Sequence, residues 1–142
     1  MIKIRRPMPL LTVALPNLGH LTFVQEDVTG RIRAWDVTLA GQVVADGRQP
    51  QAFSLTAHSV TEEFIREHYE GINLEYARSC DLSRPILAVP QGGMITIIDG
   101  WHRLLRAVLE EKEELPMHLL TQEEADAVLW LDLPPGSGVI WK

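Results

Sequence analysis

The sequence predicts an α+β fold with a mixed sheet, and two patterns support this prediction. Up to about residue 58, short apolar segments alternate with turns that contain Gly, Asn or Asp, which is typical of antiparallel strands. Beyond that point, apolar residues recur at helical spacing in segments that are interrupted by short strands. A length of 142 residues is sufficient for one domain with its own core.

In the first part of the chain we expect an antiparallel β meander over residues 10–57. Its strands are predicted at residues 10–15, 21–24, 32–39 and 42–45. The edge strands of such a meander pair readily with an extended segment of another chain. The N-terminal β region is therefore a candidate surface for a protein partner or for self-association.

The second part predicts helices and strands in alternation. Hydroxyl and acidic residues at 59–63 indicate a helix start, and apolar residues continue at helical spacing to Tyr76, although Gly71 weakens the pattern. The further predicted elements are a β-hairpin with strands at 86–89 and 94–98, a helix at 101–113, a strand at 115–120 and a helix at 121–131 that opens with a Thr121–Glu124 capping box.

We expect a single domain made of three parts. These are a β-rich extension over residues 1–58, a core over residues 59–132 and a tail over residues 133–142. The prolines of the tail cannot continue a helix, and Trp130 or Trp141 is expected to pack against it.

Composition argues against two classes of partner. The chain has 13 Lys and Arg against 19 Asp and Glu, a net charge of −6, whereas nucleic-acid affinity depends on clustered cations, so DNA is not an expected partner. No stretch approaches the ~20 apolar residues of a membrane span, and prolines interrupt the apolar N-terminal run. One cysteine, Cys80, fits a reducing compartment. We therefore expect a cytoplasmic protein.

One segment combines groups that bind anions. Residues 95–110 predict a buried strand that runs into a glycine and then a helix, whose first amides have no internal acceptor. Basic side chains in the first turn oppose the helix dipole by roughly 0.3–1 kcal/mol each, and a bound anion would relieve that conflict. The predicted phosphate-binding residues are Gly100, Trp101, His102, Arg103 and Arg106.

Each of these residues also has a structural interpretation. Arg103 could pair with Glu110 or with a loop carboxylate, and Arg106 could form an i,i+4 pair with Glu110. His102 could bond a carbonyl, and Asp99 could cap the helix. Trp101 lies on the apolar side of the helix, which favours core packing over stacking on a base.

Other polar residues carry less information. Ser83 and Arg84 could face the same pocket, and a general base could come from Asp81, Asp99 or Glu110. Cys80 has no recognisable activating partner, and the glutamates at 62–70 predict a solvated helix face. The remaining histidines show no ligand spacing, so no metal site is predicted; they are His20, His58, His68 and His118.

The order of these segments resembles the ParB/sulfiredoxin superfamily over about residues 81–126. The shared core is Gly-x-x-Arg at a strand-to-helix turn, here within Ile98–Leu104 (IDGWHRL), followed by a strand with an early proline, Leu115–Leu120. In that superfamily the motif binds the phosphates of a nucleotide, ATP in sulfiredoxins and CTP in ParB proteins. The resemblance implies this role for Gly100, His102, Arg103 and the backbone of Trp101.

Two departures limit what the resemblance implies. Sulfiredoxins place their reactive cysteine after the glycine, where this chain has Trp101, so reductase chemistry is not implied. ParB proteins append a helix-turn-helix DNA reader, whereas only about twenty residues follow here.

The expected function is the binding of a nucleoside triphosphate or another phosphorylated ligand. Hydrolysis or phosphoryl transfer would require Mg²⁺, a carboxylate such as Asp99 and an acid–base group such as His102. Whether the protein is an enzyme is left open at this point. The alternative is a non-catalytic protein-interaction or regulatory module, and a DNA nuclease is less favoured.

Overall fold

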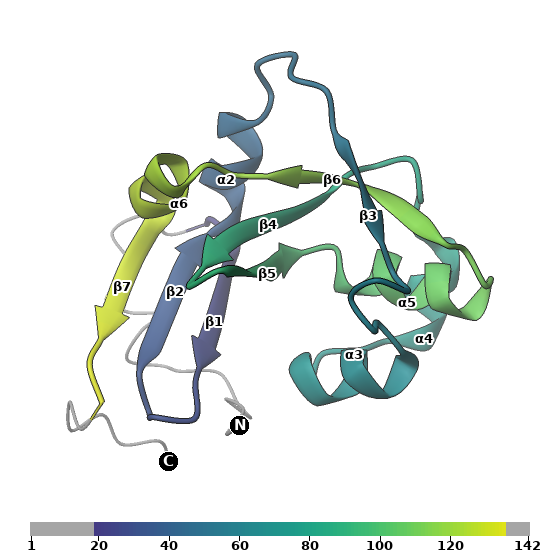
Figure 1. Ribbon diagram of the computed structural model, residues 1–142, viewed down its shortest axis with the longest axis horizontal. Helices are drawn as coiled ribbons and strands as arrows, with labels where there is room; N and C mark the ends of the chain where they lie inside the picture. Colours follow the sequence, from purple (N-terminus) through teal and green to yellow (C-terminus); the bar gives the residue numbers. More distant parts are fainter. Residues whose placement is uncertain (1–18, 136–142) are drawn as a thin grey trace.

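The computed structural model describes residues 19–135, which form two β-sheets and five short helices (Figure 1). The α+β class is therefore confirmed. The strand predicted at residues 10–15 and the predicted contact of Trp141 lie outside the described residues.

The smaller sheet joins strands from opposite ends of the chain. It consists of β1 (Thr22–Glu26), β2 (Ile32–Asp36) and β7 (Leu129–Leu133), in the order β1-β2-β7 with both pairs antiparallel. The β1–β2 turn is closed by the Asp27 carboxylate, which accepts the amides of Thr29 and Arg31. The Arg31 side chain in turn forms a bidentate ion pair with Asp132 of β7.

The larger sheet is mixed, as predicted. It consists of β3 (Gln51–Ser54), β6 (Glu114–Leu119), β4 (Ile86–Gln91) and β5 (Met94–Asp99), in the order β3-β6-β4-β5. β4 and β6 run parallel, and the other two pairs are antiparallel. The predicted β4–β5 hairpin is confirmed.

Within the described residues, the predicted meander is confirmed for the β1–β2 hairpin and is wrong after it. Residues 37–43 form a helix, α2 (Val37–Val43), because the Asp36 carboxylate caps it by accepting the Leu39 amide at 2.9 Å. Val37, Ala40 and Val44 are buried at helical spacing and pack into the core. β3 pairs with β6 from the far end of the chain.

The helices of the second half are shorter than predicted. The pattern from residue 64 to residue 76 divides around Gly71 into α3 (Glu62–His68) and α4 (Leu74–Ser79). α5 (Trp101–Leu109) ends because Glu111 adopts a left-handed φ of 57°. The predicted capping box opens α6 (Gln122–Val128), but the residues that follow pair with β2 as strand β7.

β4 separates two halves of the core and is buried on both faces. Ile86 and Ala88 pack with α3, α4 and α5, on the right-hand side of Figure 1. Leu87 and Val89 point the other way and pack with α2 and α6. None of the helices within residues 19–135 is long and apolar enough to cross a membrane.

Candidate functional site

The helix that carries the predicted site starts at a tight turn. β5 ends at Asp99, Gly100 adopts φ +105°, and α5 begins at Trp101. A Cβ on Gly100 would lie 2.5 Å from Cγ2 of Ile86. The missing side chain of Gly100, one of the predicted phosphate-binding residues, therefore allows α5 to start directly against strand β4.

The N-terminus of α5 has no side-chain cap. Each of the other four described helices is capped by a side chain, from Asp36, Thr61, Asn73 or Thr121. At α5 the cap residue is Gly100, and within residues 19–135 no acceptor bonds the amides of Trp101, His102 and Arg103. Three main-chain donors therefore lie together at the positive end of the helix dipole.

Arg103 belongs to the first turn of α5 and is only 7% exposed. Its Nη1 donates to the carbonyl oxygens of Arg84 at 3.1 Å and Pro85 at 2.9 Å, and its Nη2 donates to Oδ2 of Asp99 at 3.0 Å. Three of the five guanidinium N–H groups are thus engaged, and the other two have no acceptor among residues 19–135. The carboxylate partner that the sequence left open is Asp99, and Glu110 pairs elsewhere.

Asp99 places a negative charge beside the start of α5. It does not cap the helix, and its side chain is 37% exposed while it bonds Arg103. Burial raises the pKa of Tyr69, and the charge of Asp99 raises it further. Asp99 and Arg103 therefore neutralise each other at the predicted phosphate site.

His102 faces the connection between α3 and α4. Its Nε2 accepts the Asn73 amide at 3.0 Å, and the Tyr69 and Tyr76 rings contact the imidazole edge-to-face at centroid distances of 5.7 and 4.8 Å. Burial lowers the pKa of His102, and a hydrogen bond with the Gly71 carbonyl partly offsets this. A neutral ring with Nε2 as acceptor carries its hydrogen on Nδ1.

The two remaining predicted residues have structural partners. Arg106 pairs with Glu110 at 2.6 Å, as the i,i+4 alternative expected, and its Nη1 donates to the Cys80 carbonyl. Trp101 is 5% exposed, and its Nε1 donates to the Ile97 carbonyl. The core packing favoured for Trp101 is therefore what the structure shows.

Among the other candidates named from the sequence, Asp81 has its pKa lowered by hydrogen bonds from Ser83 and further by the charges of Arg84 and Arg103. Ser83 bonds Asp81, and Arg84 meets Arg103 through its carbonyl. His20 contacts the buried carboxylate of Asp36. Within residues 19–135, no three His, Cys, Asp or Glu side chains are arranged to hold a metal ion.

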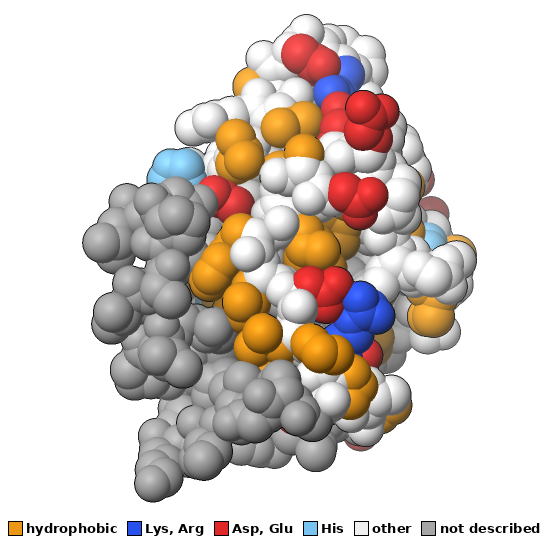
Figure 2. Space-filling view, turned by 90° about the vertical axis from the view of Figure 1, so that its left-hand side faces the viewer, with side chains coloured by type: hydrophobic (Ala, Val, Ile, Leu, Met, Phe, Trp, Pro, Cys, Tyr) orange, Lys and Arg blue, Asp and Glu red, His pale blue; other side chains and the backbone are white. Residues whose placement is uncertain are grey.

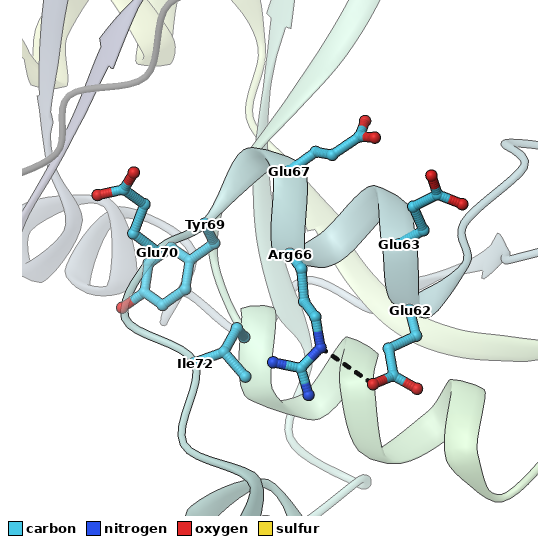
Figure 3. A pocket seen from close by; sticks show the side chains of 7 residues that line it. All are labelled: Glu62, Glu63, Arg66, Glu67, Tyr69, Glu70 and Ile72. Carbon is cyan, nitrogen blue, oxygen red and sulfur yellow. Dashed lines mark hydrogen bonds and ion pairs between the residues drawn. The ribbon is translucent and has the colours of Figure 1, made fainter.

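A pocket next to this site was not predicted. It runs along α3 and the segment after it, with the Glu62–Arg66 ion pair at one end and Tyr69 and Ile72 at the other (Figure 3). Its remaining lining residues are acidic: Glu63, Glu67 and Glu70. The sequence identified the glutamates as a helix face but gave no sign that Tyr69 and Ile72 complete a wall.

Comparison of the chain with known proteins identified no similar protein. No family model matches the chain, and no curated protein or solved structure is significantly similar to it.

Proposed function

We propose that the start of α5 binds a phosphate group of a small ligand, with a nucleoside triphosphate such as ATP or CTP as the class that the sequence resemblance implies. The observation that carries the proposal is the uncapped N-terminus, where the amides of residues 101–103 have no acceptor among the described residues. Such amides at a helix N-terminus form a ready binding site for phosphate.

The geometry assigns Arg103 an indirect role in this proposal. Its guanidinium bonds two carbonyls and Asp99 and so holds the strand-to-helix turn in place. In this arrangement it does not present a bidentate pair of donors to a phosphate. The guanidinium is only 7% exposed, and the Asp99 carboxylate lies beside it. Asp99 is therefore the group that opposes an anion at this position.

The described residues do not fit a resident Mg²⁺. Asp99 is the carboxylate at the turn, and one of its oxygens is held by Arg103. An Mg²⁺ ion would thus enter with the triphosphate, and we assign the protein no metal-dependent step.

Thermal unfolding with added ligands tests the proposal. The midpoint is measured with ATP, CTP and inorganic phosphate, each with and without Mg²⁺, and a ligand at one hundred times its dissociation constant stabilises by about 2.7 kcal/mol. Asp99→Asn should enlarge the shift because it removes the opposing charge. Glu110→Gln, which removes the same charge at the other end of α5, should leave it unchanged.

Two outcomes would reject the proposal. One is the absence of a shift with every ligand in both the wild type and Asp99→Asn. The other is an equal response of Asp99→Asn and Glu110→Gln, which would reflect net charge alone. Where a ligand does bind, following product formation decides between an enzyme and a sensor.

The structure also favours a second candidate, an interaction module that uses the edges of the smaller sheet. Among the described strands, β1 and β7 form those edges. Leu21 and Val28, next to the two ends of β1, are 70% and 72% exposed. Figure 2 shows the face that carries β7, where hydrophobic side chains lie exposed among charged ones. Light scattering of the wild type and Leu21→Lys tests self-association through this region.

A further inference from the structure

The connection between α3 and α4, residues 69–73, is held against α5 by a few contacts. Its first residue, Tyr69, stacks on Trp101 at a centroid distance of 5.9 Å. Its last residue, Asn73, donates its amide to Nε2 of His102 and caps α4 by accepting the Tyr76 amide at 3.0 Å. Asn73 therefore links the start of α4 to the first turn of α5.

We propose that His102 is a pH-sensitive latch, which holds residues 69–73 on α5 while its ring is neutral and releases Asn73 when Nε2 takes up a proton. A protonated imidazole has two donors and no acceptor. An Nε2–H would point at the Asn73 N–H, so the two donors would repel each other. The Gly71 carbonyl is the one acceptor of this connection that favours the charged ring.

The groups around His102 do not compensate a positive charge on the ring. Tyr69 of the connection and Tyr76 of α4 contact the imidazole through their aromatic rings, which supply no carboxylate to pair with it. On its own helix, Arg103 and Arg106 are turned to carbonyl oxygens and to their own carboxylates. The Asp99 carboxylate bonds Arg103 and its charge also acts on Tyr69, but within residues 19–135 no carboxylate pairs with His102.

The direction of the pH effect follows from burial. The pKa of His102 is lowered in the folded chain relative to the ordinary 6.5, so the unfolded or opened form binds the proton more strongly. The latch is therefore fully closed above pH 6.5 and opens as the pH falls through the folded pKa.

Opening the latch would alter the pocket beside α3. Three residues of the connection form one end of that pocket: Tyr69, Glu70 and Ile72 (Figure 3). Release of Asn73 frees the segment that carries this wall, whereas α3 itself stays anchored by buried Ile65. The device does not depend on phosphate binding at α5.

Amide hydrogen exchange measured by NMR on the full chain between pH 7.5 and pH 5 tests the latch. The protection factor of the Asn73 amide should fall by up to about tenfold as the pH drops from 7.5 to 5. The Tyr76 amide should follow, because its acceptor is Asn73. The Glu124 amide, bonded to the Thr121 hydroxyl, serves as the internal control.

Two variants and one direct titration complete the experiment. In His102→Gln, whose side chain does not titrate, the pH dependence at Asn73 should disappear, and in His118→Gln it should persist. The proposal would be overturned if the Asn73 protection factor of the wild type did not change across this pH range. It would also be overturned if the pH dependence of that protection factor persisted in His102→Gln. The ring resonances of wild-type His102 provide a test that needs no variant, since a pKa at or above 6.5 would also overturn it.

Discussion

Gly100 lies against Ile86 so closely that a Cβ at position 100 would be 2.5 Å from Ile86 Cγ2 and 2.9 Å from its Cβ. The contact joins the start of α5 to the central strand β4, and it requires both the missing side chain and the left-handed φ of +105°. The conformation of this turn therefore depends on packing within the protein.

Gly100→Ala should destabilise the protein strongly. Overpacking and a left-handed non-glycine residue each cost about 1–3 kcal/mol, so we expect a loss of about 2 kcal/mol or more. Gly41→Ala is the matched control, because Gly41 lies within α2 with open space around its Cβ position, and it should stabilise by about 0.5–1 kcal/mol. Urea unfolding measures both, and equal effects of the two substitutions would contradict the role of the Ile86 contact.

Substitutions at the Asp99–Arg103 pair should rank by the number of acceptors they leave unpaired. Arg103→Ala leaves the carbonyls of exposed Arg84 and half-buried Pro85 without their charged donor, at about 1–3 kcal/mol in all. Arg103→Lys should cost about half as much. The lysine ammonium keeps the positive charge and can bond some of the three acceptors, but it cannot reach all of them. Asp99→Asn should cost less than about 1 kcal/mol, because the carboxylate is 37% exposed.

The free energy of unfolding is measured by urea titration for each variant. The variants are compared only where the dependence of that free energy on urea concentration, the m-value, is unchanged. If Asp99→Asn were as damaging as Arg103→Ala, the ion pair would dominate over the carbonyl contacts, and our account of Arg103 would be wrong.

The sequence predicted most of the segment from β4 to β6 because its signals are local. An apolar strand, a glycine turn and a helix with one apolar side follow each other without interruption between residues 86 and 109. The β7 strand could not be predicted in this way, because its extended form depends on pairing with β2, about one hundred residues away in the chain.

The same limit applies to the site. Asp99 and Arg103 are four residues apart across the Gly100 turn, so their proximity follows from the local strand-to-helix geometry. The carbonyls that hold Arg103 lie 18 and 19 residues away, and the amide that binds His102 lies 29 residues away. The direction in which each side chain turns was therefore decided by contacts that periodicity does not reveal.

Glu124 should make stability depend on acidic pH. Its hydrogen bonds with Arg48 and with the Thr121 backbone lower its pKa from 4.5 to about 2. Because the folded pKa is depressed, the stabilisation is fully present above pH 4.5 and is lost as the pH falls through about 2. The difference in unfolding free energy between wild type and Glu124→Gln should therefore shrink steadily between pH 5 and pH 2.

A matched variant checks the cause of this pH dependence. Glu123→Gln removes a neighbouring carboxylate from the same first turn and is the control for the change in net charge. A constant difference between wild type and Glu124→Gln across this range would show that the pairing with Arg48 does not hold in solution.

Asp36 decides whether residues 37–43 form a helix, and its substitution tests why the predicted strands are wrong. Its buried carboxylate accepts the Leu39 amide and contacts His20, so Asp36→Ala removes the cap and should cost about 1–2 kcal/mol with a loss of helical circular dichroism. Asp36→Asn keeps an oxygen acceptor and should retain most of the helix. Thr121→Ala at the start of α6 should lower stability through the same mechanism without affecting α2. If Asp36→Ala left the α2 amides as protected from exchange as in the wild type, the buried Val37–Ala40–Val44 face would suffice to form the helix, and the cap would be secondary.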